Sequence, residues 1–501
     1  MDINADPSVL YTISPEDQFF SAASGMQDDF EWYYDNYRRI MPWMQQLTPT
    51  NGNTNNFTRD VSNFNTRYGK VYYGRVGPRL ADVTHLIDQL PAEEQAKRAQ
   101  LRSITDIFMG YYAFYVSDIN GSIPYSEAFQ ARYGGTLTPK YDDQLTLFTT
   151  IDQQLKDAVT ALKAAPAVAQ VSLVNKDLFF NGDASKWIKA ANALRLRIAL
   201  RWMKQDKAKA QSIAAEVAAD AAGSMNSIDD SWVFEANYTF AAAGSNWSPI
   251  DLRAPKPTVD FMNANSDPRI RLFYTKNVNG DYVGSFTSPD AAKDPANAAL
   301  YDTPGLLSNI QPRLFSAAEN SGTGINFFPL ITYADYCFMR AEAAVQGLTA
   351  DNASTWYTNG VTASIQFYDK KAAAAQVEGY VKVDQSEIDA YLNQAAVKFD
   401  AAKALNQIAS QAYIDYYKNP NEAWALYKRT GMPNNNTVLQ LAVLKSNNVA
   451  VEIPRRAPLT LGVPTDMNYE NQKAAYEDMA KNPDFGQGPN DAFGRVWWDK
   501  K

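Results

Sequence analysis

Residues 177–201 read DLFFNGDASKWIKAANALRLRIALR and contain the clearest helix pattern of this sequence. Asn181 and Gly182 predict a turn, since both residue types tolerate positive φ. Asp183 follows the turn and can cap a helix by accepting hydrogen bonds from its first free N–H groups. Apolar residues then recur at helical spacing, at Trp187, Ala191, Leu194, Ile198 and Trp202. The pattern predicts an amphipathic helix over residues 183–202.

Three arginines, Arg195, Arg197 and Arg201, lie in the last turns of this predicted helix. Cations near a helix C-terminus are favourable because they complement the helix dipole. We therefore interpret the three side chains as structural, engaged with the dipole and in ion pairs.

The length of 501 residues indicates more than one simple core, either a large repeat-built unit or two lobes. Aromatic residues make up 13% of the chain, with 29 tyrosines and 10 tryptophans. Such rings either fill gaps between irregular helices or form stacking surfaces for a ligand, since each has an apolar face and a polar group.

Charge and residue counts exclude several classes of function. The net charge of −8 disfavours nucleic acid as a partner, because its binders carry basic patches. A single cysteine, Cys337, excludes an internal disulfide and a cysteine-based metal site. A single histidine, His85, excludes sites built on several histidines. We expect Cys337 to be a buried small hydrophobe and His85 to be structural.

No apolar run approaches the ~20 residues that span a bilayer, and the sequence shows no signal peptide. Met1 is followed directly by polar Asp2, which we interpret as an expression start placed after a removed segment.

Further helices are predicted on both sides of the opening segment, whereas residues 224–326 are rich in Gly, Pro, Asn and Ser and look irregular. Within them, residues 274–286 predict a hairpin with an Asn-Gly turn. In the helix after Thr332, Asp335 is placed to complete a capping box. The predicted helices cover residues 14–23, 28–44, 68–90, 102–116, 142–165, 204–222, 332–347, 351–368, 385–391, 401–418 and 421–431.

Short motifs spread over nearly the whole chain resemble the SusD/RagB family and follow the order found there. They are the Asn-x-Asp-Pro start, PYSEA at 124–128, Lys186-Trp187 with the helix that follows, DPR at 267–269, the AE-containing helix near 341, RTG at 429–431 and PRR at 454–456. Each motif is weak alone, but their joint order is specific.

This resemblance implies an all-α fold of degenerate TPR-like helical repeats with an irregular, loop-rich second lobe. We expect an N-terminal helical part at 1–223, the irregular ligand-side lobe at 224–326, and a C-terminal helical part at 327–501 that packs with the first as one unit. The resemblance also implies a lipid-anchored protein of the outer-membrane surface. Such a protein captures oligosaccharide and delivers it to a SusC-like TonB-dependent transporter.

A search for catalytic motifs finds no phosphate-binding loop, no HExxH and no GxSxG. The adjacent carboxylates Asp28-Asp29, Asp142-Asp143 and Asp229-Asp230 are interpreted as helix caps or solvated turns. We predict no catalytic residue, no cofactor and no metal ligand set, although a calcium ion held by loop oxygens stays open. The protein is expected to be a binding protein and not an enzyme.

A sugar is bound by an aromatic ring against its C–H face and by polar side chains at its hydroxyls. The residues to consider are therefore aromatics in polar loops, with Trp247 as the predicted stacking surface. Two loops qualify, one early and one in the irregular lobe, and the family places its glycan contacts in such regions. The predicted ligand-binding residues are Trp43, Asn53, Asn55, Tyr68, Asn246, Trp247, Asp251 and Arg253.

Three other functions remain open from the sequence. A RagB-like protein would capture peptides instead of glycans. A glycoside hydrolase would need a pair of carboxylates brought together by folding. A helical-repeat scaffold would bind proteins only.

Overall fold

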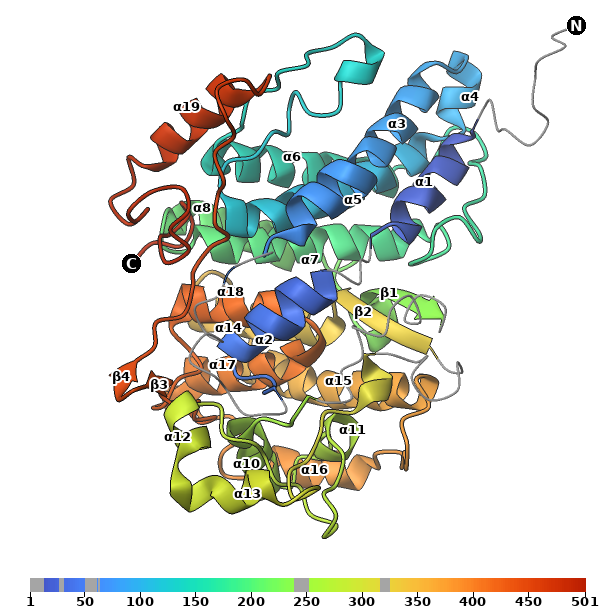
Figure 1. Cartoon of the computed structure of the whole chain (residues 1–501). Coiled ribbons are helices and arrows are strands. Elements are labelled where there is room, and N and C mark those ends of the chain that lie inside the picture. The colour runs from blue at the N-terminus through green and yellow to red at the C-terminus, as the bar shows by residue number, and fades with distance from the viewer. Residues whose placement is uncertain (1–12, 27–30, 50–60, 62–63, 238–251, 316–324) are drawn as a thin grey trace, which may run out of the picture.

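The computed structural model describes residues 13–26, 31–49, 61, 64–237, 252–315 and 325–501. Its regular structure is almost entirely helical, which confirms the predicted fold class. Figure 1 shows an upper half built from α1, α3 and α5–α8, and a lower half that contains α14, α15, α17 and α18. The short helices α10–α13 and α16 lie at the lower edge.

The upper half is a series of helices in which each packs against the next. The α1–α3, α3–α5, α5–α6, α6–α7 and α7–α8 pairs are all in contact, as expected for TPR-like repeats. The elements of the upper half are α1 (Pro15–Ser24), the π-helical η2 (Arg67–Val76), α3 (Gly77–Asp88), α4 (Ala92–Ala96), α5 (Ala99–Asn120), α6 (Gln144–Lys163), α7 (Ala184–Trp202) and α8 (Lys207–Ala219). The π-helical η1 (Glu31–Ile40) and α2 (Met41–Trp43) lie in the lower half, where η1 contacts α18.

The lower half combines helices with one small sheet, in which β1 (Trp232–Asn237) pairs antiparallel with β2 (Ile325–Ile331). The helices are α10 (Lys256–Asn265), α11 (Ile270–Phe273), α12 (Pro289–Lys293), α13 (Ala298–Asp302), α14 (Tyr333–Val345), α15 (Ala353–Ala374), α16 (Gln385–Leu392), α17 (Ala404–Asp415) and α18 (Pro420–Thr430). A two-residue hairpin, β3 (Lys445–Ser446) and β4 (Val449–Ala450), precedes α19 (Tyr469–Met479), which returns to the upper half.

The helix predicted from the opening segment is confirmed as α7. The Asp183 carboxylate caps it by accepting from the backbone N–H groups of Ser185 and Lys186, at 2.9 and 3.3 Å. Trp187 is fully buried, and its indole N–H donates to Asp177 at 2.7 Å. The sequence pattern therefore located the cap correctly. The prediction of an amphipathic helix was wrong, because residues 190–202 are buried on every side of α7, where the polar side chains are held in ion pairs and hydrogen bonds.

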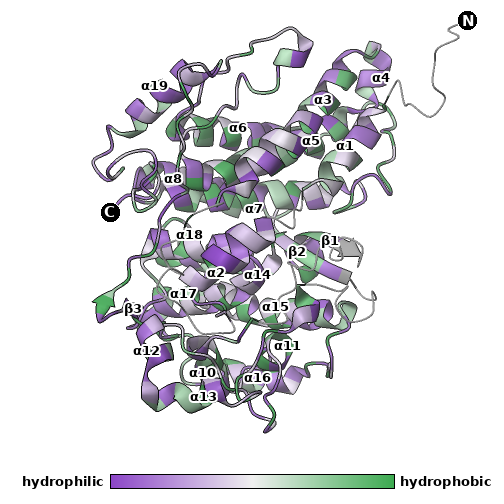
Figure 2. Cartoon of the chain, in the orientation of Figure 1, coloured by the Kyte–Doolittle hydropathy of each residue, from purple (hydrophilic) through white to green (hydrophobic). Residues whose placement is uncertain are grey.

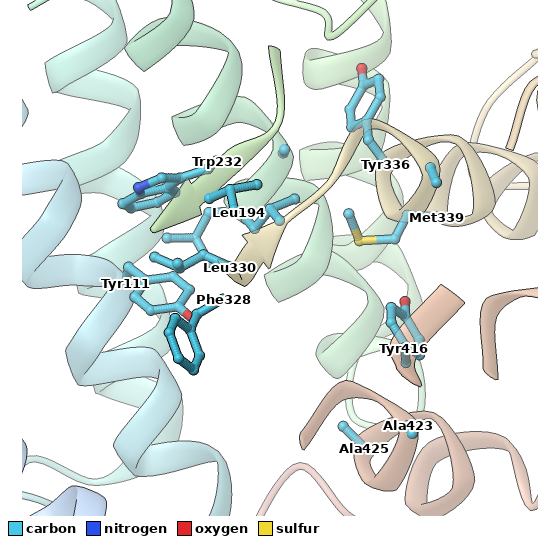
Figure 3. Packing of buried hydrophobic residues seen from close by; sticks show 14 of the residues in the cluster. Tyr111, Leu194, Trp232, Phe328, Leu330, Tyr336, Met339, Tyr416, Ala423 and Ala425 are labelled. Carbon is cyan, nitrogen blue, oxygen red and sulfur yellow. The ribbon is translucent and has the colours of Figure 1, made fainter. Parts of the chain in front are cut away.

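One buried apolar cluster runs through both halves. Figure 3 shows Tyr111 of α5, Leu194 of α7, Trp232 of β1 and Leu330 of β2 packed side by side. Along the helices, apolar and polar residues alternate between faces (Figure 2), as expected for helices with one buried side. The two halves thus share a core.

The three arginines of α7 form buried ion pairs, as predicted. Arg195 binds Asp152 at 2.8 Å, within the upper half. Arg197 pairs with Asp335 of α14, and its Nε lies 3.6 Å from Glu422 of α18.

Arg201 contacts two carboxylates, Asp118 of α5 at 2.8 Å and Glu422 at 3.0 Å. Burial alone would raise the pKa of Glu422, but the two guanidinium groups of Arg197 and Arg201 outweigh burial and lower it. The carboxylate therefore stays ionised and links α7 to α18.

Two local predictions were wrong because longer-range contacts prevail. Thr332 caps α14, but the Asp335 carboxylate binds Arg197 and the Tyr416 hydroxyl instead of completing a capping box. In residues 274–286 the Asn-Gly turn forms, with Gly280 at φ +85°, and the Asn277 N–H donates to the Asp281 carbonyl across it at 2.8 Å. Beyond this bond the two arms pair with other segments and not with each other. One arm pairs with Asn309 and Ile310, and the other with Ala254 and Pro255.

We predict that Glu422→Gln lowers the free energy of unfolding by about 3 kcal/mol, because it leaves two buried arginines short of a counter-charge. Chemical denaturation followed by circular dichroism measures the change. The matched control is Asp229→Asn, which breaks an exposed ion pair with Lys370 and should cost less than about 1 kcal/mol. Equal losses in the two variants would contradict a structural role for the buried pair.

Candidate functional site

The predicted ligand-binding residues fall into three groups. Asn53, Asn55, Asn246, Trp247 and Asp251 lie outside the described residues. Trp43 is fully buried, and Tyr68 and Arg253 are half-buried.

The prediction that Trp43 binds the ligand was wrong. Its ring packs against Phe64 at 5.3 Å and Trp424 at 5.4 Å between centroids, and no part of it is exposed. It ends the short helix α2 and belongs to the core, so it offers no face on which a ligand could stack. The polar sequence that follows residue 47 made Trp43 resemble a loop residue.

Arg253 lies where the early part of the chain meets the irregular lobe. Its backbone N–H donates to the Thr48 carbonyl at 2.8 Å, and Thr48 donates back at 3.0 Å. The Arg253 side chain donates to the Asn309 side-chain oxygen at 2.7 Å. Thr48 belongs to the early predicted loop, at residues 43–68, and Arg253 to the predicted loop of the irregular lobe, so the structure holds one residue of each loop together.

Tyr68 lies elsewhere, in a pocket of about 480 Å³ beside α19. Arg253 does not line this pocket, so the structure does not bring the two residues together. We call it the tyrosine pocket, after its three tyrosines. Its side chains that can stack or hydrogen bond are Phe64, Asn65, Tyr68, Asn120, Ser122, Tyr141, Thr460, Gln472 and Tyr476.

Segments far apart in the sequence build the tyrosine pocket. Tyr68 lies in the first turn of η2, and Asn120 is the last residue of α5. Tyr141 lies just before α6, and Gln472 and Tyr476 are one turn apart on one face of α19. Two walls therefore come from the upper half and one from the C-terminal segment.

Hydrogen bonds fix the polar groups of the pocket. The Asn65 and Asn120 amides bond to each other at 2.7 and 3.1 Å. Gln472 donates to the Thr460 carbonyl and to the Tyr476 hydroxyl, both at 3.1 Å. The Tyr68 and Tyr141 hydroxyl oxygens lie 3.5 Å apart. These groups are thus held in place before any ligand arrives.

The phenols of the pocket are neutral at physiological pH. Burial raises the pKa of Tyr68, with the neighbouring Tyr141 hydroxyl as a further cause. Burial also raises the pKa of Tyr141, and it raises that of Tyr476 to about 12. Each hydroxyl therefore keeps its proton and can act as a hydrogen-bond donor.

The lining of the tyrosine pocket includes no Asp or Glu among the described residues. Nor do the described ranges contain a group of three His, Cys, Asp or Glu residues that could hold a metal ion. Aromatic rings with amides and hydroxyls suit the binding of a neutral polar ligand, with stacking on one face and hydrogen bonds at the edge.

The buried acid Asp35 holds one segment of the pocket wall in place. Asp35 of η1 has no exposed surface and accepts from the Asn65 backbone N–H at 3.1 Å and the Thr66 hydroxyl at 3.2 Å. Burial raises the pKa of Asp35 to about 8, against the opposing effect of the Arg67 guanidinium. Asp35 therefore holds the segment that carries Asn65 and Tyr68.

Sequence reasoning identified only Tyr68 among the residues of this pocket. Asn65 and Tyr141 were not among the predicted ligand-binding residues. Nothing local marks Asn120, Gln472 or Tyr476 as site residues, because helical spacing alone makes them look like ordinary surface or core positions.

The comparisons with known proteins identify the family. The SusD-like family described as "Starch-binding associating with outer membrane" matches residues 10–458. The chain belongs to this SusD-like family. No curated protein matches it.

Several solved structures share the fold over nearly the whole chain. A chitin-binding protein is 25% identical, with a TM-score of 0.76, over 97% of this chain and 100% of the other. A chitin-binding SusD homologue from Flavobacterium johnsoniae is 21% identical, with a TM-score of 0.71, over 97% and 98%. A SusD homologue from Bacteroides fragilis NCTC 9343 is 19% identical, with a TM-score of 0.72, over 97% and 100%. Below 25% identity the likeness shows the fold alone.

The family is associated with the outer membrane. In the part of the chain that the structure describes, no helix is both long enough and apolar enough to cross a membrane.

We predict that Asp35→Asn makes the protein progressively more stable than the native protein as the pH rises from about 4 to about 8. An acid whose pKa is raised by folding keeps its proton in the folded state, so folding loses stability over this range as the unfolded chain ionises. The gain should reach at most about 1.4 kcal/mol per pH unit and level off above pH 8. Denaturant titrations at several pH values measure it.

A difference in stability that stays constant from pH 5 to pH 9 would show that Asp35 is already ionised in the folded protein.

Proposed function

We propose that this protein captures oligosaccharide at the cell surface and delivers it to a SusC-like TonB-dependent outer-membrane transporter. The observation that carries the binding part is the tyrosine pocket, where three tyrosines meet fixed amides without a lining carboxylate. Membership of the SusD-like family and the likeness to a chitin-binding protein at 25% identity support a glycan as the ligand.

The pocket offers both kinds of contact that a sugar needs. A tyrosine ring covers the apolar C–H face, while the amides of Asn65, Asn120 and Gln472 reach the hydroxyls at the edge. The Asn65 and Asn120 amides bond to each other, and Gln472 bonds to Thr460 and Tyr476. A sugar hydroxyl can therefore replace or extend existing hydrogen bonds without ordering the side chains first.

The proposed role is binding without hydrolysis. Glycosidases place two carboxylates across the scissile bond at a set separation. The described lining of the tyrosine pocket offers neither of them. A sugar bound there would be released intact.

Delivery requires a place at the membrane and a partner. We propose that the native protein is held at the outer surface by an N-terminal lipid and associates there with a SusC-like transporter. The support is the family, whose description associates it with the outer membrane. Trp247, which lies outside the described residues, remains our prediction for a second stacking surface.

We predict that Tyr141→Ala weakens oligosaccharide binding by about 5- to 150-fold, the range that loss of one stacking ring produces. The ligand is the tightest-binding sugar from a glycan array that also carries peptides, and titration calorimetry measures the affinity. Tyr141→Phe should lose less, because it keeps the ring. Tyr380→Ala is the matched control, since Tyr380 is also half-buried but does not line the pocket.

Preferential binding of peptides on that array would replace the glycan by a peptide as the ligand. Release of reducing sugar by the purified protein, lost on mutation of one Asp or Glu, would show an enzyme instead of a binding protein.

We also predict that the native protein, purified from membranes of its own cells in mild detergent, brings a TonB-dependent transporter with it. Mass spectrometry of the co-purified proteins identifies the partner. Recovery of the protein alone, under conditions that preserve other outer-membrane complexes, would contradict the proposed delivery.

A further inference from the structure

A second pocket of about 350 Å³ adjoins the tyrosine pocket, and Ser122 lines both. We call it the apolar pocket, because most of its accessible surface is apolar and comes from Leu145, Met479, Phe485, Val496 and Trp497. Its lining also includes the polar side chains Ser122, Asp143, Gln144, Asp478, Lys481, Asn482 and Arg495. The proposed function assigns it no role.

The two pockets lie in line along α19. Gln472 and Tyr476 face the tyrosine pocket, and Met479 faces the apolar pocket. Seven residues of helix separate Gln472 from Met479, which corresponds to about 10 Å along the axis. The opposite wall is continuous as well, since the chain passes from Asn120 in one pocket to Gly121 and Ser122 in the other. One extended ligand that follows α19 would therefore contact both.

The boundary between the pockets is a close contact. The Ser122 backbone N–H points to the Met479 sulfur at 3.4 Å. Gly121 has φ +75°, and a Cβ at this position would lie 2.5 Å from that sulfur. Only glycine lets the thioether approach so closely. Met479 is thus seated at the junction, where a ligand passing between the pockets would touch it.

The apolar pocket offers surface that a plain sugar cannot use well. Leu145 is 46% exposed, and the half-buried Trp497 ring is held edge-on against Trp202 at 4.8 Å. The cations at the rim are already paired, Lys481 with Asp478 at 2.7 Å and Arg495 with Asp499 at 3.0 Å. A ligand group that enters therefore meets mainly hydrocarbon, aromatic ring and sulfur.

This contrast between the pockets constrains the ligand. A hexose that carries only hydroxyls would lose water from them in the apolar pocket without adequate replacement, which costs free energy. An acetamido substituent ends in a methyl group, which gains free energy on burial. Its amide can bond to the hydroxyl of Ser122 or the side chain of Asn482, both of which line this pocket.

We propose that the groove formed by the two pockets binds oligosaccharides of N-acetylated hexosamines, with an acetamido methyl group in the apolar pocket. This inference rests on the proposed function and deepens it. The tyrosine pocket takes a sugar ring of any substitution, and the apolar pocket selects the N-acetyl group.

The wall of the groove can be altered with little effect on folding. Tyr476, Leu459 and Phe485 form a small apolar cluster of their own, with Met479 packed against it and apart from the main core. Met479 and Leu145 are only partly covered. Met479→Gln keeps the length of the side chain, and Leu145→Asn changes an exposed position, so both variants should fold.

Titration calorimetry of the full chain compares two probes, a β-1,4-linked hexamer of N-acetylglucosamine and the matched hexamer of glucose. We expect the native protein to bind the N-acetylated hexamer more tightly by at least about fourfold, the factor contributed by burial of one methyl-sized group. Met479→Gln and Leu145→Asn should each reduce this preference, measured as the ratio of the two affinities in the same variant. Val381→Asn, at a 60% exposed position that lines neither pocket, should change nothing.

Equal affinity of the native protein for the two hexamers would overturn the inference and leave the proposed glycan binding intact. A preference that survives both pocket variants would also overturn it, because the selection would then arise elsewhere. Binding of neither hexamer overturns it too, while the proposed function is then decided separately by the glycan array and by Tyr141→Ala.

Discussion

The buried contact of Arg197 and Arg201 with Glu422 is the interaction on which the arrangement of the two halves depends. The arginines belong to α7 in the upper half and the carboxylate to α18 in the lower half. Asp335 of α14 and Asp118 of α5 complete the network. Removing these charges from water is expensive, so the network is stable only if every member is present in the correct geometry. Four helices are thereby fixed relative to one another.

The same network positions the candidate site. Asp118, held by Arg201, lies two residues before Asn120, which presents its amide in the tyrosine pocket. The Asp118 carbonyl also accepts from the indole N–H of Trp498 at 2.9 Å, and the Trp498 ring lies over Arg201 at 4.9 Å. The C-terminal segment that supplies the α19 wall is therefore docked where the network ends. Both walls of the groove are therefore positioned by the same set of buried charges.

The sequence predicted those parts of the structure that depend on neighbouring residues. Asp183 as a cap and the arginines as ion-pair partners follow from spacing along one helix. The partners of the arginines do not, since Asp335 and Glu422 lie 138 and 221 residues away from the arginines they bind. The capping box failed for this reason, because Asp335 has a stronger partner outside its own helix. Of the site, only Tyr68 was predicted, since distant segments build the rest.

The chemistry of the groove is consistent with the charge of the whole chain. The protein carries a net charge of −8, yet the tyrosine pocket presents neutral phenols and amides, and the cations at the rim of the apolar pocket are paired. An unpaired buried charge would cost free energy, which this arrangement avoids. Specificity in such a groove has to come from ring stacking, hydrogen-bond geometry and apolar contact. These are the contacts through which the groove can distinguish one neutral glycan from another.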